Sequence, residues 1–219
     1  MAIKMPKLSD KTVEKILDDR IDRRLVVSKY YLNKIIGKFN LDGGWDHFYF
    51  TTNLDSFVFF ASNAIEIISR EINNEFSLIN ENEVSIYKIK KQLDQNIENQ
   101  NKIIQLISKY FENPHNGKNV DYSHSSLWCL RELRNIIAHG KTLIRTVSSG
   151  SSYYGFIIPY PIREQNNKII GVDRIEIFDT DKYFTNMYND LEVFCDSVKQ
   201  IIPKKYHSYQ HKNQLNFEL

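Results

Sequence analysis

The sequence contains no long hydrophobic run. Its longest apolar stretches, such as Phe57 to Ala61 and Ile136 to Ala138, are far shorter than the roughly 20 residues that a membrane-spanning helix needs. The first residues include lysines but no apolar segment behind them, which argues against a secretory signal. We therefore expect a cytoplasmic protein without a membrane anchor, and the 42% hydrophobic and 26% charged residues are typical of a globular one.

Cysteines are few, and the common catalytic motifs are absent. Cys129 and Cys195 lie far apart at apolar positions of predicted helices, so we expect two buried thiols and no disulfide. The chain has no P-loop, GxGxxG, GxSxG, HExxH or paired CxxC. No two histidines have metal-ligand spacing on one helix, and we expect His115 and His124, which flank a loop, to be exposed. The sequence predicts neither a protein-built metal site nor a cofactor.

Neither sign of charge dominates the whole chain. The 29 Lys and Arg residues nearly cancel the 27 Asp and Glu residues, which leaves a formal net charge of +2. Any binding of nucleic acid must therefore come from a local cluster of basic residues.

Helical periodicity covers most of the chain, and its 219 residues are typical of one compact domain. The predicted helices run from Ser9 or Asp10 to Gly37, from Thr52 or Asn53 to about Ile72, from Val84 to about Phe111, from Ser123 or Ser125 to Gly140, and from Thr180 to Pro203. Between the last two helices, Thr142 to Phe178 is β-branched and aromatic, with expected turns at Ser148 to Ser152 and Glu164 to Asn167. Asp179 and Asp181 are expected to cap the last helix and complement its dipole.

The predicted fold class is mainly α: an up-and-down helical bundle with a small antiparallel β insertion before the last helix. We expect residues 1–206 to form this single domain, with the insertion at about 142–178, and residues 207–219 to be a C-terminal tail. We also expect the insertion to form an antiparallel sheet that is not part of the catalytic bundle, although it could reshape or cover the site.

The predicted fourth helix has two contrasting faces. One face is expected to pack in the core and carries Cys129, Leu130, Leu133, Ile136 and Ile137. The opposite face carries Arg131, Arg134, Asn135, Ala138 and His139. Lys141 and Arg145 follow, and Glu132 is the only acid in this stretch. This is the local cluster of basic residues that the net charge conceals.

Such a set of side chains suits phosphodiester chemistry without a metal ion. Arginine binds phosphate oxygens through its planar fork, and histidine transfers protons near neutral pH. An ordinary structural explanation also exists, because His139, Gly140 and Lys141 are common at helix ends, where they satisfy the last carbonyl groups.

Arg134, Asn135 and His139 form an RNxxxH sequence that resembles the motif of the HEPN superfamily. Members of that superfamily are helical bundles with the motif near the end of a late helix. The resemblance implies a metal-independent endoribonuclease, usually a homodimer, of the kind found in toxin-antitoxin, abortive-infection and antiviral-defence systems. It implies that Arg134 and His139 are catalytic, and that a polar residue of an earlier helix contributes, for which Glu66 and Arg70 are candidates.

Within this interpretation Asn135, Arg131, Lys141 and Arg145 would bind or orient the RNA. Its other partners would be a second copy of the chain and an antitoxin protein. A homodimer is chemically useful because cleavage by a ribose 2′-hydroxyl needs one proton removed and one delivered, yet each chain has a single motif histidine.

Two alternatives stay open from the sequence. The first is a catalytically silent HEPN-type bundle that binds nucleotides or a partner protein through the same face. The second is a helical scaffold or immunity protein with a coincidental motif, which a buried ion pair of Arg134 within the monomer would favour.

Overall fold

The computed structural model describes residues 19–37, 47–95, 101–116, 122, 125–139, 144–147, 154–163, 169–177 and 179–202. Its helices are α2 (Arg20–Ile35), α3 (His47–Phe76), α4 (Ile86–Gln95), α5 (Asn101–Phe111), α6 (Ser126–Ala138) and α7 (Thr180–Ile201), with 3-10 turns η1 (Glu81–Glu83) and η3 (Pro114–Asn116). Its strands are β1 (Ile144–Val147), β2 (Tyr154–Arg163) and β3 (Ile169–Ile177). The protein is thus mainly helical with a small antiparallel sheet between α6 and α7, as the sequence predicts.

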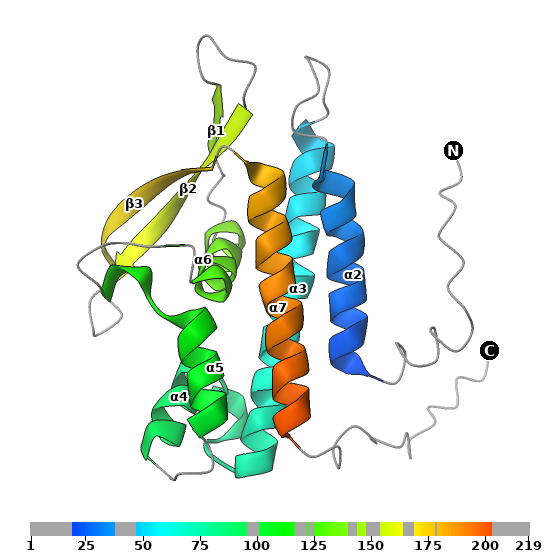
Figure 1. Cartoon of the computed structure of the whole chain (residues 1–219). Coiled ribbons are helices and arrows are strands. Elements are labelled where there is room, and N and C mark those ends of the chain that lie inside the picture. The colour runs from blue at the N-terminus through cyan, green and yellow to red at the C-terminus, as the bar shows by residue number, and fades with distance from the viewer. Residues whose placement is uncertain are drawn as a thin grey trace, which may run out of the picture.

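The long helices α2, α3 and α7 lie side by side, with α6 beside them, α4 and α5 at one end and the sheet on one flank (Figure 1). Apolar residues of α7 point into the core between these helices. The side chains of Phe184, Met187, Leu191, Phe194 and Val198 are buried. This stripe is the core face of the last helix. Cys129 and Cys195 are free and buried, as expected.

The first described helix begins later than the sequence suggests. Asp19 has an extended backbone, and its Oδ1 accepts hydrogen bonds from the N–H groups of Ile21 (2.8 Å) and Asp22 (3.2 Å). A continuous helix from Ser9 or Asp10 is therefore wrong at Asp19, because this side chain caps a new helix start. Residues 1–18 lie outside the described part of the chain.

The end of α2 agrees with its predicted glycine. Gly37 has a φ of +71°, a conformation that suits glycine, and its N–H donates a hydrogen bond to Asp181 Oδ2 (2.8 Å). Asp179 caps α7, since its Oδ1 accepts from the Lys182 N–H (3.0 Å). Asp179 therefore caps the helix as predicted, while Asp181 also ties α7 to the end of α2.

Two other predicted helix boundaries are wrong. α3 begins at His47 and not at Thr52 or Asn53. Phe50, in its first turn, is buried, so the apolar face extends beyond the expected start. The single helix predicted from Val84 to Phe111 is instead two helices, α4 and α5, which pack against each other; residues 96–100 between them lie outside the described residues.

The sheet has the strand order β1-β2-β3, and both pairings are antiparallel. It packs against the helices. Tyr160 of β2 is fully buried, its ring lies 5.6 Å from that of Trp128 on α6, and its hydroxyl group is hydrogen-bonded to that of Tyr183 on α7. The sheet therefore extends the core over α6. The two turns expected between the strands lie outside the described residues.

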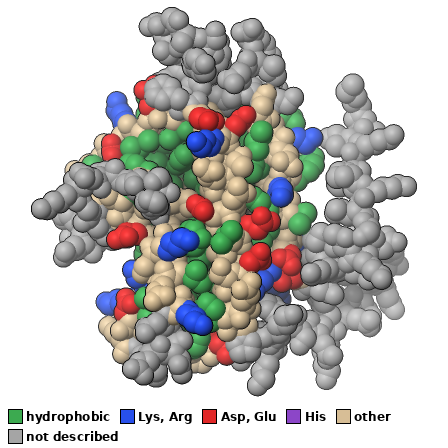
Figure 2. Space-filling model, in the orientation of Figure 1, with side chains coloured by type: hydrophobic (Ala, Val, Ile, Leu, Met, Phe, Trp, Pro, Cys, Tyr) green, Lys and Arg blue, Asp and Glu red, His purple; other side chains and the backbone are tan. Residues whose placement is uncertain are grey.

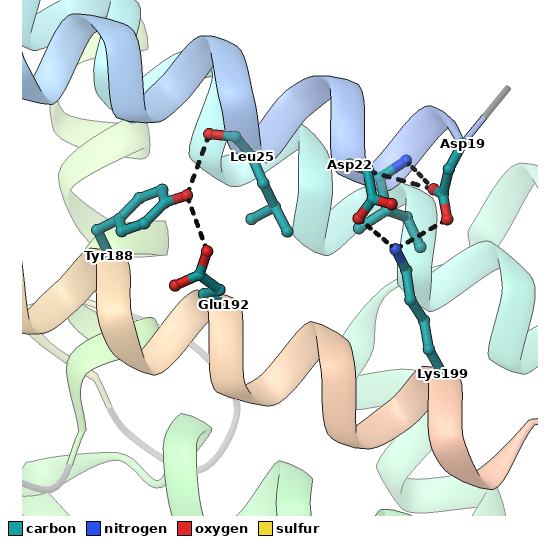
Figure 3. A network of polar contacts seen from close by, with 7 residues as sticks. Asp19, Asp22, Leu25, Tyr188, Glu192 and Lys199 are labelled. Carbon is teal, nitrogen blue, oxygen red and sulfur yellow. Dashed lines mark hydrogen bonds and ion pairs between the residues drawn. The ribbon is translucent and has the colours of Figure 1, made fainter. Parts of the chain in front are cut away.

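A polar network ties α7 to the start of α2 (Figure 3). Lys199 Nζ lies 2.8 Å from Asp19 Oδ2 and 2.6 Å from Asp22 Oδ1. Burial alone would raise the pKa of Asp19, but the hydrogen bond and charge of Lys199, with the backbone N–H donors, hold it below its usual value. In the same network the Tyr188 hydroxyl donates to the Leu25 carbonyl (3.4 Å). None of the helices in the described ranges is long and apolar enough to cross a membrane.

Candidate functional site

Helix α6 presents its polar residues because its other face is firmly packed. Its buried residues are Leu127, Trp128, Cys129, Leu130, Glu132, Leu133 and Ile136. This confirms the predicted core face, except that Ile137 is only half-buried. Arg131, Arg134 and Asn135 are half-buried, and Ala138 and His139 are exposed.

Arg134 makes a surface ion pair with α3. Its Nη2 lies 3.7 Å from Glu66 Oε1, and the two side chains are 42% and 55% exposed. Its Nη1 also lies 3.5 Å from Asn135 Oδ1, at the limit of hydrogen bonding. An exposed pair of this kind stabilises the fold by about 1 kcal/mol at most. Arg134 is therefore not in the buried ion pair that would have favoured a scaffold.

Arg134 lines a hollow between α3, α4 and α6 with a volume of about 210 Å³. The residues around this α3–α4–α6 hollow are Ser62, Ile65, Glu66, Ser69, Arg70, Val84, Ser85, Ile86, Arg131, Arg134 and Asn135. Glu66 and Arg70, the two candidates from the earlier helix, are both among them. The Ser62 hydroxyl is buried and has no hydrogen-bond partner within the described ranges, although hydroxyl groups at such depth are normally paired.

Arg131 is held at the wall of this hollow by two neighbours. Its guanidinium carbon lies 4.3 Å from the centre of the Tyr87 ring, and Nη1 lies 3.7 Å from Glu132 Oε1. Burial raises the pKa of Tyr87 to about 12 against the opposing charge of Arg131, so the phenol stays neutral. Neither Tyr87 nor the burial of Glu132 was foreseen. The only signal in the sequence for the burial of Glu132 is that it is the one acid among the basic residues of this helix.

His139 lies at the C-terminal end of α6, where its backbone N–H donates to the Asn135 carbonyl (3.1 Å). Alanine at this position would make the same backbone hydrogen bond. The His139 imidazole, however, has no hydrogen-bond partner among the described residues. The side chain lines a second hollow of about 110 Å³ between α6 and the sheet. This α6–sheet hollow is lined by Glu132, Asn135, Ile136, His139, Pro159, Pro161, Ile169 and Val172.

The two motif residues thus line different hollows of one chain. Arg134 and His139 are five positions apart, which places them about 140° apart around the helix. Asn135 lines both hollows, so it lies between the two side chains. One chain therefore does not direct Arg134 and His139 at a single small group.

The remaining sequence candidates are only partly described. Lys141 lies outside the described residues, and for Arg145 the description covers the β1 backbone, which pairs with Phe156. His124 also lies outside them. His115 was expected to be an exposed loop residue, which is wrong. It is half-buried, its Nε2 lies 3.1 Å from the Tyr122 hydroxyl, and burial lowers its pKa against the opposing charge of nearby Asp173.

The part of the chain that the structure describes holds no group of three or more His, Cys, Asp or Glu side chains placed to bind a metal ion. In comparisons with known proteins, no family model, no curated protein and no solved structure matches this chain. The arrangement of the α6 side chains is therefore the basis for any functional assignment.

Proposed function

We propose that the protein is a metal-independent endoribonuclease of the HEPN type that acts as a homodimer. The observation that carries this proposal is the state of Arg134 and His139. Both side chains are available at the rims of two hollows that share Asn135, and neither is bound into the core. Arginine and histidine in such positions suit binding of a phosphate and transfer of a proton.

A second copy of the chain would bring together the two motif side chains, which line different hollows of one chain. A twofold axis near Asn135 and the small Ala138 side chain would bring Arg134 of one chain toward the histidine of the other. Exposed apolar residues flank this region, since Ile169 and Val172 of β3 line the His139 hollow and are each 49% exposed. Burial of such residues favours association of the two copies.

In the proposed reaction a ribose 2′-hydroxyl of RNA attacks the adjacent phosphorus atom. The His139 side chain of one chain takes the hydroxyl proton, and that of the other chain delivers a proton to the departing 5′-oxygen. Arg134 stabilises the additional negative charge on the phosphate oxygens, and Asn135 orients the substrate. Arg131, fixed against Tyr87, holds a neighbouring phosphate.

This activity would suit a toxin or an antiviral-defence effector in the cytoplasm, held in check by an antitoxin protein. Glu66 fits a positioning role here, because its carboxylate is the contact of Arg134 on α3. Removal of the Glu66 carboxylate would leave the guanidinium group of Arg134 in place but less well oriented.

The test is cleavage of a mixed RNA pool by the full chain in the presence of EDTA. We expect cleavage by the wild type, resistance of DNA, and a loss of about 100-fold to 10,000-fold in His139→Ala. Arg134→Lys should also lose most activity, because an ammonium group keeps the charge but not the planar fork. Lys182→Ala, an exposed change in the first turn of α7, is the matched control.

Two results would contradict the proposal. One is undiminished cleavage by a folded His139→Ala protein, and the other is a strict requirement for a divalent ion. Either would leave a catalytically silent module that binds nucleotides or a partner, or a helical scaffold, as the better account.

A further inference from the structure

Four aromatic side chains form a continuous row across α2 and α3. Tyr30 packs edge-on against Tyr31 at 5.3 Å, and Tyr31 stacks on Phe60 at 5.7 Å with an interplanar angle of 4°. Phe60 in turn packs edge-on against Phe59 at 5.4 Å. Phe59 is 52% exposed, which is unusual for so large an apolar side chain. We call Tyr30, Tyr31, Phe60 and Phe59 the aromatic row.

Positive charges border the aromatic row. The guanidinium group of Arg24 lies over the Phe60 ring at 5.5 Å, and Lys34 Nζ lies over the Tyr30 ring at 5.2 Å. The basic residues of α2 are Arg20, Arg23, Arg24, Lys29 and Lys34. Its one acid, Asp22, is engaged by Lys199 of α7. Figure 2 shows acidic and basic side chains interspersed on the face of the molecule that it draws.

The aromatic row leads toward the candidate site. Phe59, Asn63 and Glu66 are separated by four and three residues, so they lie along one stripe of α3. The separation of seven positions between Phe59 and Glu66 corresponds to about 10 Å along the helix axis. Glu66 is the ion-pair partner of Arg134 at the α3–α4–α6 hollow. An extended ligand could therefore reach from Phe59 to Arg134 along a single helix.

We propose that the aromatic row and its bordering cations bind single-stranded RNA next to the bond that is cleaved. This inference rests on the proposed ribonuclease function. Bases would stack on the exposed Phe59 ring and on Tyr30, while Arg24 and Lys34 contact phosphates. At about 3.4 Å per stacked nucleotide, the distance from Phe59 to Glu66 spans about three nucleotides. Because every base has a stacking face, this contact binds RNA with little sequence preference.

The charge pattern favours RNA over a second copy of the chain as the occupant. In a twofold-symmetric contact through the aromatic row, Arg24 and Lys34 would face the same two cations of the copy, and these like charges would repel each other. A polyanion with exposed bases complements both the cations and the rings. Two acids lie along this side of α3, Asp55 one turn before Phe59 and Glu66 two turns after it, and the charge of Glu66 is opposed by Arg134.

The test measures binding separately from cleavage. The His139→Ala protein, which should not cut, is titrated against a fluorescent unstructured 12-nucleotide RNA, and its Kd is compared with those of His139→Ala/Phe59→Ala and His139→Ala/Lys34→Ala. We expect Phe59→Ala to weaken binding about fivefold or more, the lower range for loss of one base–aromatic stack. Lys34→Ala should reduce the slope of log K against log salt concentration by about 0.7, the value for one single-strand phosphate contact.

Two changes on α7 serve as controls, Val193→Ala for an exposed apolar residue and Lys182→Ala for an exposed cation, and both should bind RNA unchanged. An unchanged Kd and salt slope in the Phe59 and Lys34 variants would overturn the proposal, even if the wild type cleaves RNA. A fall from dimer to monomer on Phe59→Ala, measured by light scattering, would also overturn it and identify a contact between copies. A wild type that binds through this surface but does not cleave would contradict the proposed function alone.

Discussion

Replacing Arg134 or His139 by alanine should leave the stability of the protein almost unchanged. The Arg134 side chain is 42% exposed, and its ion pair with Glu66 is 3.7 Å long and also exposed. Such pairs contribute about 0 to 1 kcal/mol. The 3.5 Å contact with Asn135 is too long to add much. His139 is exposed, and the hydrogen bond that ends α6 comes from its backbone N–H, which alanine retains.

We therefore expect the free energy of unfolding of each variant to lie within about 1 kcal/mol of that of the wild type. Leu133→Ala, on the opposite face of the same helix, is the contrasting change. Its side chain is fully buried, so its truncation should cost about 2 to 5 kcal/mol. Together the variants compare the two faces of α6 by the same measurement.

Urea unfolding followed by tryptophan fluorescence provides that measurement, at one protein concentration for all variants because dimer stability depends on concentration. Trp128, one of the two tryptophans of the chain, is buried on α6 and contributes a signal from this helix. A loss above about 2 kcal/mol in Arg134→Ala would refute the reasoning, because it exceeds any exposed ion pair. It would show that Arg134 is structural and would favour the scaffold interpretation.

Two further predictions concern pH and subunit exchange. Burial, reinforced by the negative charge of Asp19, raises the pKa of Glu71 from 4.5 to about 7. The carboxylate form therefore destabilises the folded state as the pH rises through this range, and Glu71→Gln should gain about 1 to 2 kcal/mol at pH 8, after a discount for screening by solvent, but nothing at pH 4. Equal gains at both pH values in urea unfolding would contradict this. Mixing equal amounts of wild type and His139→Ala, with subunit exchange, should leave about a quarter of the full activity if two histidines share one site. If half of the activity remained, each chain would instead carry an independent site.

Local patterns in the sequence predict much of the fold because they have local causes. The apolar spacing of α6 and α7 follows from the helical period, and β-branched residues between them predict the sheet. Gly37 could be assigned as a helix end because helices commonly end at a glycine in the left-handed conformation, which Gly37 has. The polar face of α6 follows from the same spacing, so Arg134, Asn135 and His139 could be placed on it without a structure.

Features that depend on tertiary contacts could not be predicted in the same way. Asp19 begins a helix within an apparently continuous helical pattern, and its carboxylate is also held by Lys199, which lies far away in the sequence. Glu132 lies near the charge of Arg131, but its carboxylate is buried, which the helical pattern does not predict. Most importantly for function, the sheet packs on α6, and its strands form one wall of the hollow at His139. No periodicity within β2 or β3 indicates which helix they cover.

The chemical ends of the RNA products test the central claim most directly. If the ribose 2′-hydroxyl is the nucleophile, mass spectrometry should find 2′,3′-cyclic phosphate, or its hydrolysed form, on one product and a 5′-hydroxyl on the other. These ends should form in EDTA with the wild type and disappear with His139→Ala. Products with a 5′-phosphate and a 3′-hydroxyl would contradict the account, because water and not the ribose would then have attacked the phosphorus.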